Sequence, residues 1–128
     1  MLYTEPNVHV LTNEINGQLE TLNVCLRCQA TPTNCDALAK VSCIVLKKTL
    51  ACILIARGFR IQRSADMRSI IITCRDNRVP IPNWVYQMSG WLIKIDTGMP
   101  VPPTAPNILY GFGSNVQRYA LSVIGYQR

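Results

Sequence analysis

The densest group of chemically active side chains in this sequence is a run of arginines near the middle of the chain. Six arginines fall within 22 residues, at positions Arg57, Arg60, Arg63, Arg68, Arg75 and Arg78. The planar guanidinium group donates hydrogen bonds in pairs, a geometry that matches phosphate and carboxylate oxygens. We therefore expect these side chains to bind a polyanion, either nucleic acid or an anionic membrane surface. The alternative is that they form an ordinary solvated surface.

The charge distribution along the chain supports a localised basic surface. Residues 1–39 carry a net charge of −3, residues 40–80 a net charge of +7 and residues 81–128 a net charge of +2, which together give the overall +6. Clustering of like charge raises self-repulsion, which a bound anion would relieve.

A possible zinc site involves the cysteines near the N-terminus. Cys25 and Cys28 are separated by two residues, a spacing that lets two thiolates bind one zinc ion, and Cys35 and the single histidine, His9, could complete the ligand set. The pattern resembles the first half of the fungal binuclear zinc cluster, but Leu46 stands where its second half requires a cysteine. We expect no metal and six reduced thiols, with zinc at Cys25 and Cys28 as the alternative.

No arrangement of residues in the sequence indicates catalysis. A nucleophilic scheme that uses histidine would depend on His9 alone, and the seven acidic residues are scattered without a pairing that suggests acid–base chemistry. Residues 111–114 resemble the glycine-rich tail of trimeric dUTPases, but the rest of that pattern is missing, and we interpret them as a turn between strands. The sequence therefore predicts a protein that is not an enzyme and holds no cofactor.

One short peptide motif lies in a proline-rich stretch. Pro103, Thr104, Ala105 and Pro106 spell PTAP, which resembles the late-domain motif of viral matrix and Gag proteins. The resemblance implies that a host sorting-machinery domain could bind residues 103–106, provided that they are extended and accessible. A chance match within a proline-rich segment is the alternative.

Length and composition indicate one domain over residues 1–128. The chain is 48% hydrophobic and 16% charged, values of a protein with a packed core. It contains no apolar run long enough to cross a membrane, and its first six residues lack the features of a secretory signal. We therefore expect an intracellular protein, in the cytoplasm or the nucleus.

Apolar periodicity predicts two N-terminal helices. Leu11, Ile15, Leu19, Leu22 and Leu26 recur at helical spacing, which favours a helix over about 11–27, although Asn16-Gly17 is typical of a hairpin turn. A second helix is predicted over about 35–57, with Asn34 as its cap and Gly58 just beyond its end. It should be apolar over most of its circumference, apart from a narrow polar stripe that includes Lys40 and Lys47 and faces solvent.

The rest of the chain has the composition of strands. Residues 59–63 alternate, residues 70–73 are β-branched throughout, residues 84–95 are aromatic and apolar, and residues 119–126 suggest a last strand. We therefore predict an α+β fold in which the N-terminal helices pack on a C-terminal, mainly antiparallel sheet.

Three functions remain compatible with the sequence. The favoured one is a non-enzymatic structural or interaction protein that binds a polyanion and self-associates through its apolar helices and sheet; the PTAP resemblance would make it a small viral matrix-like protein. The second is a small nucleic-acid-binding regulator, with or without zinc. The third is an enzyme whose site the sequence does not reveal.

Overall fold

Helices supply all the regular structure of the described part of the chain. The structure is a computed structural model that describes residues 7–126. Its helices are, in chain order, α1 (Val8–Arg27), α2 (Pro32–Ala56), α3 (Met67–Asp76), α4 (Asn83–Gln87), α5 (Ser89–Asp96) and α6 (Pro106–Tyr126). These residues contain no strand, so the predicted α+β fold with an antiparallel sheet was wrong. The prediction about a secretory signal concerns residues 1–6, which lie outside the described residues.

The first helix lies where the apolar spacing predicted it and starts three residues earlier. The Asn7 side chain accepts a hydrogen bond of 2.9 Å from the backbone N–H of Val10, which satisfies one of the donors that a helix leaves free at its start. The buried side chains of α1 are Leu11, Ile15, Leu19 and Leu22. Their face packs against α2 and α6, and this packing outweighs the hairpin tendency of Asn16-Gly17.

The second helix is the centre of the fold. It starts earlier than predicted, because Thr31 rather than Asn34 caps it and Pro32 occupies its first turn. Gly58 follows its end with a φ of 92°, a left-handed conformation that glycine adopts without steric cost. Leu38, Val45 and Cys52 are fully buried and Ile53 is partly buried, as expected for a helix that is apolar over most of its circumference. α1, α3, α5 and α6 all contact α2.

The β-branched segment that suggested a strand is the helix α3. Asp66 caps it by accepting a hydrogen bond of 2.8 Å from the backbone N–H of Ser69. The buried residues of α3 are Met67, Ile70, Ile71 and Cys74, which follow helical spacing. Burial of this face against α2 and α5 outweighs the modest helix penalty of its three isoleucines.

The aromatic segment and the C-terminal segment are also helical. Residues 83–96 form α4 and α5, which meet at Met88. In α6 the buried residues recur every three or four positions: Leu109, Phe112, Val116, Ala120, Val123 and Ile124. The rings of Trp84 and Trp91 meet Phe112 edge to face, with centroids 6.0 and 5.2 Å apart. The glycine-rich residues 111–114 therefore lie inside α6, and the interpretation as a turn between strands was wrong.

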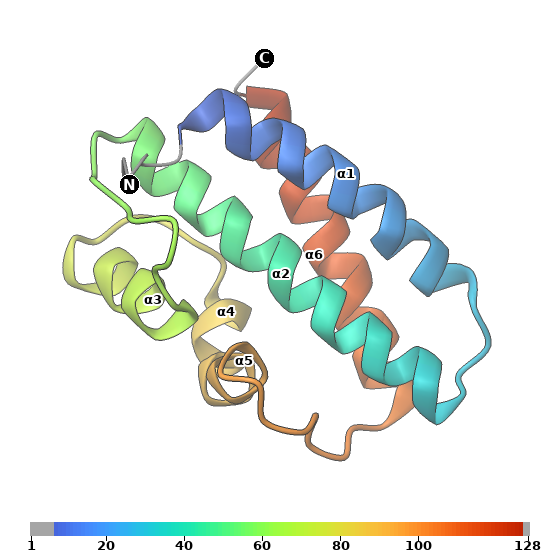
Figure 1. The fold of residues 1–128 in the computed structure, drawn as a ribbon. Coiled ribbons are helices and arrows are strands. Elements are labelled where there is room, and N and C mark those ends of the chain that lie inside the picture. Colours follow the sequence, from blue (N-terminus) through green and yellow to red (C-terminus); the bar gives the residue numbers. More distant parts are fainter. Residues whose placement is uncertain (1–6, 127–128) are drawn as a thin grey trace.

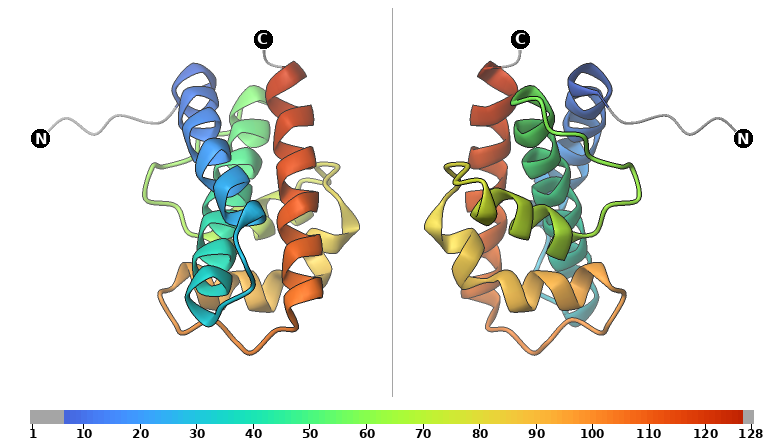
Figure 2. Two further views of the ribbon diagram at one scale, coloured as in Figure 1. Left: turned by 90° about the vertical axis from the view of Figure 1, so that its right-hand side faces the viewer. Right: turned by 90° about the vertical axis from the view of Figure 1, so that its left-hand side faces the viewer.

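The helices form two layers around α2. α1, α2 and α6 lie side by side, with α1 antiparallel to the other two, while the short helices α3, α4 and α5 lie across the other side of α2 (Figures 1 and 2). This second layer and the α2–α3 connection carry the arginines of the predicted binding surface.

Gly113 of α6 packs closely against side chains of α1 and α2. A Cβ atom placed there would lie 3.0 Å from Leu38 Cδ1 and 3.1 Å from Leu26 Cδ2, whereas one at Gly111 would meet nothing within 4 Å. We expect Gly113→Leu to lower the free energy of unfolding by about 1–3 kcal/mol through overpacking. Gly111→Leu should raise it by up to about 1 kcal/mol, because leucine favours a helix over glycine. Urea denaturation of both variants tests this, and equal shifts in the two variants would contradict the proposed packing.

Candidate functional site

Most of the predicted arginines gather around α3. Arg68 and Arg75 belong to α3 itself, Arg78 lies two residues beyond its end, and Arg57 follows the end of α2. All four are exposed. Arg57 is close enough to Cys74 of α3 for its charge to lower the pKa of that thiol, although burial raises this pKa to about 11 overall.

Arg60 joins this group, whereas Arg63 does not. Arg60 lines a shallow hollow with Ser69 and Thr73 of α3. Arg63 extends instead to Glu14 of α1, with which it forms an ion pair. We call Arg57, Arg60, Arg68, Arg75 and Arg78 the arginine surface.

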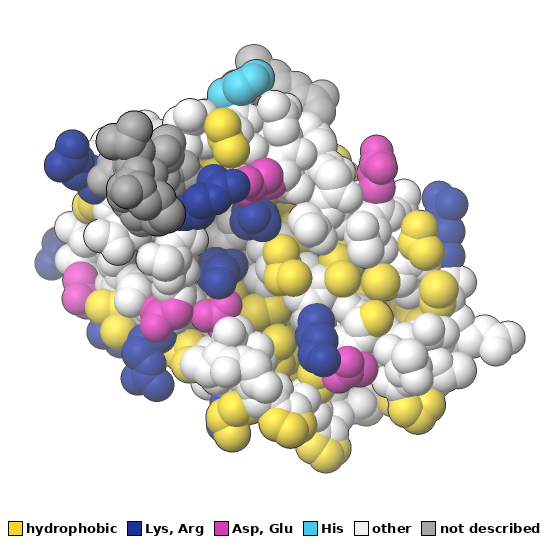
Figure 3. All heavy atoms as spheres, in the orientation of Figure 1, with side chains coloured by type: hydrophobic (Ala, Val, Ile, Leu, Met, Phe, Trp, Pro, Cys, Tyr) yellow, Lys and Arg dark blue, Asp and Glu magenta, His cyan; other side chains and the backbone are white. Residues whose placement is uncertain are grey.

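Two acidic residues lie among these arginines. Asp76 forms an exposed ion pair of 3.4 Å with Arg75. Asp66 accepts the capping hydrogen bonds of Ser69, which lower the pKa of its carboxyl group. Among the described residues of this surface, arginines therefore outnumber carboxylates. Basic side chains accordingly concentrate on the side of the molecule that carries α3 (Figure 3).

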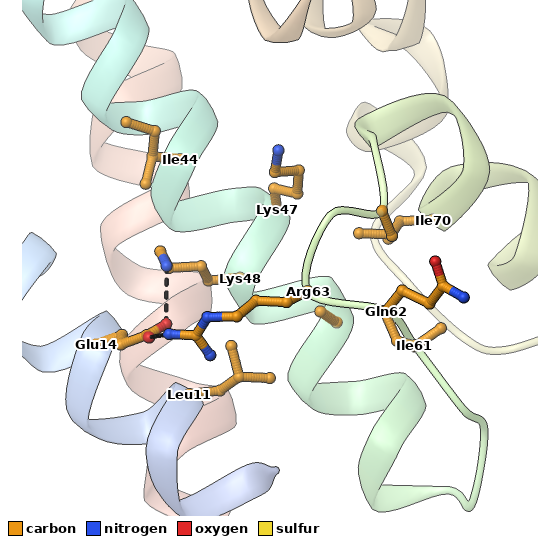
Figure 4. Close-up of a pocket in the computed structure, with 11 residues that line it drawn as sticks. Leu11, Glu14, Ile44, Lys47, Lys48, Ile61, Gln62, Arg63 and Ile70 are labelled. Atoms are coloured by element: carbon orange, nitrogen blue, oxygen red, sulfur yellow. Dashed lines mark hydrogen bonds and ion pairs between the residues drawn. The ribbon is translucent and has the colours of Figure 1, made fainter. Parts of the chain in front are cut away.

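A cleft lies between α1, α2 and the connection that leads to α3. It has a volume of about 250 Å³, and its lining residues are Leu11, Glu14, Ile44, Lys47, Lys48, Ala51, Ile61, Gln62, Arg63, Ala65 and Ile70. Lys48 and Arg63 reach the Glu14 carboxylate from two sides, and the Lys48 Nζ to Glu14 Oε2 distance is 2.8 Å (Figure 4). Burial raises the pKa of Glu14, but the hydrogen bonds and charges of Lys48 and Arg63 together lower it below its ordinary value. Glu14 therefore stays ionised at neutral pH.

The Lys47 ammonium group points away from Glu14 in Figure 4 and forms an ion pair with Asp96 at the end of α5. The Lys47 Nζ to Asp96 Oδ1 distance is 2.6 Å, and the other carboxylate oxygen of Asp96 accepts a hydrogen bond of 2.8 Å from the backbone N–H of Met67. A single, largely buried carboxylate therefore joins α2, α5 and the first residue of α3. In the predicted polar stripe, Lys40 is exposed, whereas the Lys47 side chain is only 31% exposed because it pairs with Asp96.

Glu14, Lys48 and Asp96 were not predicted from the sequence as site residues. Their partners lie 34 to 49 residues away in the chain, so no local pattern could indicate these contacts. The one available signal was the pair of lysines at 47 and 48, which interrupts an otherwise apolar helix.

The three cysteines of the possible zinc site lie near the turn between α1 and α2, together with Tyr110. The Tyr110 hydroxyl donates a hydrogen bond of 2.6 Å to the backbone carbonyl of Cys28. His9 lies at the other end of α1, about 24 Å along the helix axis from Cys25, so it cannot complete the ligand set. Within the described residues, no three His, Cys, Asp or Glu side chains are placed to hold a metal ion.

The PTAP segment spans the junction between a loop and α6. Pro103 and Ala105 are exposed, but the Thr104 hydroxyl donates a hydrogen bond of 2.9 Å to the carbonyl of Pro102, and Pro106 is the first residue of α6. Val101 to Thr104 line a hollow with Pro32 and Cys35 at the start of α2. An extended conformation of all four motif residues would require α6 to lose its first residue.

Comparison of the chain with protein-family models, with curated proteins and with solved structures found no match. Among the described residues, no helix combines the length and apolar character needed to cross a membrane.

Asp96 offers a test of the contact that joins the two layers. We expect Asp96→Ala to lower the free energy of unfolding by about 1–3 kcal/mol, because it leaves Lys47 and the Met67 N–H without their acceptor. Asp36→Ala is the matched control: its ion pair with Lys40 is 2.9 Å long but roughly half-exposed, so solvent screening should limit the loss to less than about 1 kcal/mol. Urea denaturation measures the free energy of unfolding of both variants. Equal losses would show that the Asp96 contacts stabilise the fold no more than an exposed ion pair does.

The cysteines should differ in reactivity. Cys43, Cys52 and Cys74 are buried, and burial raises the pKa of Cys43 to about 12 and that of Cys74 to about 11. Because the thiolate is the reactive form, we expect iodoacetamide at pH 8 to label Cys25, Cys28 and Cys35 in the native protein. All six should react in denaturant. Mass spectrometry of the labelled protein checks this, and rapid native labelling of Cys43 would contradict the packing of α2 against α5.

Proposed function

We propose that this protein is a non-enzymatic binding protein that engages a phosphate-bearing polyanion, in the first place nucleic acid, through the arginine surface. A nucleic-acid partner would place it inside the cell. The observation that carries the proposal is the grouping of five exposed arginines around one short helix.

The geometry of the arginine surface suits a regular array of phosphates. Arg68 and Arg75 are seven residues apart on α3 and therefore project from similar faces, about 10.5 Å apart along the helix axis. Each strand of a DNA duplex carries a phosphate about every 3.4 Å of helix axis, so two arginines at this separation can contact different phosphates of one duplex. Guanidinium groups can contact such phosphates in a bidentate manner.

The apolar content of the surface favours nucleic acid over a membrane. A helix that lies in a membrane interface needs a continuous apolar face directed at the lipid. The isoleucines Ile70 and Ile71 of α3 are buried against the rest of the protein, and Ile72, between Arg68 and Arg75, is the only large apolar side chain of α3 that is exposed. Phosphate contacts therefore have to supply most of the binding energy, as they do in sequence-independent nucleic-acid binding.

Removal of the two arginines on α3 tests the proposal. We expect the double variant Arg68→Gln, Arg75→Gln to bind a fluorescently labelled DNA duplex more weakly, because two phosphate contacts are lost. The slope of log K against log salt concentration should become shallower by about 1.8, or about 0.9 per contact. Fluorescence anisotropy at several salt concentrations measures both quantities.

The matched control is Arg27→Gln, Arg118→Gln, which removes the same charge from exposed positions of α1 and α6. It should retain the salt slope of the unmodified protein. If the two double variants bind DNA equally well, the arginine surface is a solvated surface and the proposal fails. Stronger binding to anionic liposomes than to DNA would instead identify a membrane as the polyanion.

A further inference from the structure

The connection between α5 and α6 contains a proline-rich segment without regular secondary structure. Residues 99–105, which we call the proline segment, form neither helix nor strand. Prolines occupy positions 100, 102 and 103, and a further proline at position 106 begins α6. The segment lies at the end of the molecule opposite the C-terminus (Figure 2). No residue from position 97 to position 109 is charged.

The prolines restrict the proline segment to an extended conformation. The pyrrolidine ring fixes φ of Pro100, Pro102 and Pro103 at about −65°. A residue that precedes a proline is confined to the extended region, which applies to Met99 and Val101. Successive residues with these torsion angles form a polyproline II helix, which has three residues per turn. Residues three positions apart therefore lie on the same face of this short helix.

The burial of the segment follows this period of three. Pro100 and Pro103 are exposed, whereas Val101 and Pro102 between them are half-buried. Val101 packs against the hydrophobic core, and the half-buried Thr104 donates a hydrogen bond of 2.9 Å to the carbonyl of Pro102. One face of the polyproline turn is therefore held against the protein, and the face that carries Pro100 and Pro103 is directed outward.

We propose that residues 99–103 are the ligand of a proline-recognition domain in a partner protein. Such domains, which include the SH3, WW and EVH1 domains, bind a polyproline II helix in a groove lined with aromatic side chains. Pro100 and Pro103 enter this groove, separated by one turn of about 9.3 Å. Met99 is 52% exposed and adds apolar contact area at the start of the ligand.

The segment is suited to this role because it is ordered before it binds. Prolines limit the conformations of the free segment, so little conformational entropy is lost when a partner groove closes on it. The packing of Val101 against the core limits them further. Because the segment has no charge, shape and apolar contact provide the recognition.

The proposed ligand differs from the PTAP motif in its register. Pro103 is common to both, but the last proline of PTAP, Pro106, is the first residue of α6. Pro100 and Pro103 both belong to the extended segment, so α6 stays intact when they bind. None of these residues belongs to the arginine surface. The proposal is therefore independent of nucleic-acid binding and can fail separately from it.

Titration of the isotope-labelled full chain with purified SH3, WW and EVH1 domains tests the proposal. At least one of the three domains should shift the amide NMR signals of Met99, Val101 and Thr104 and leave those of α3 unchanged. An excess of a proline-rich peptide that occupies the groove of that domain should reverse the shifts. If none of the three domains shifts these signals, or if the peptide does not compete, the proposal is wrong.

Substitution of the two outward prolines should weaken binding. We expect the double variant Pro100→Ala, Pro103→Ala to bind at least about tenfold more weakly, because both rings are lost and the segment gains conformational freedom. The matched control is Pro80→Ala, Pro82→Ala, which removes two prolines from the connection between α3 and α4 and should bind like the unmodified protein. Equal binding by the two double variants would contradict the proposed contact.

Two single variants complete the test. Met99→Gln keeps all the prolines and should weaken binding by a smaller factor, which provides a readout even if the double variant does not fold. Pro106→Ala should leave binding unchanged. Loss of binding in Pro106→Ala together with normal binding in Pro100→Ala would assign the ligand to the PTAP motif and overturn the proposed register.

Discussion

The fold depends on the need to cover α2. This helix of 25 residues has buried side chains around most of its circumference, including Leu38, Val45 and Leu54. Burial of each such side chain contributes about 1.5–3 kcal/mol to the free energy of unfolding. Exposure of a whole face of α2 would therefore remove more free energy than the total stability of a small domain. α1 and α6 cover one side, and α3 and α5 cover the other. The positions of the remaining helices follow from this requirement.

Two partly buried carboxylates fix the positions of the packed helices relative to one another. Asp96 joins Lys47 of α2 to the first residue of α3, and Glu14 holds both Lys48 and Arg63. Apolar contacts tolerate sliding, whereas these charged hydrogen bonds have fixed partners and directions. Asp96 fixes the start of α3, which carries the arginine surface, and Glu14 fixes one wall of the cleft.

The error in the predicted fold class has a local cause. Residues 70–73 and 84–95 are rich in β-branched and aromatic side chains, which favour strands when considered alone. The helical spacing of Met67, Ile70, Ile71 and Cys74 was present in the same sequence, but three adjacent isoleucines concealed it. These segments are helical because the surface on which they pack is another helix, α2. A short amphipathic helix can bury its apolar face against α2 and still satisfy its own backbone hydrogen bonds.

The sequence by itself determined the features that depend on near neighbours. It determined α1 and α2, because their apolar residues recur within each helical turn. It also indicated a basic surface, because the five arginines of that surface lie within 22 residues of the chain. Only the tertiary structure decided that Arg63 forms an ion pair with Glu14 and that Lys47 forms one with Asp96. It also decided that a cleft lies between α1, α2 and the α2–α3 connection. These contacts join residues 49 positions apart. Such pairs become neighbours only when whole helices pack. Chain connectivity by itself keeps close together only those residues that are near one another in the sequence.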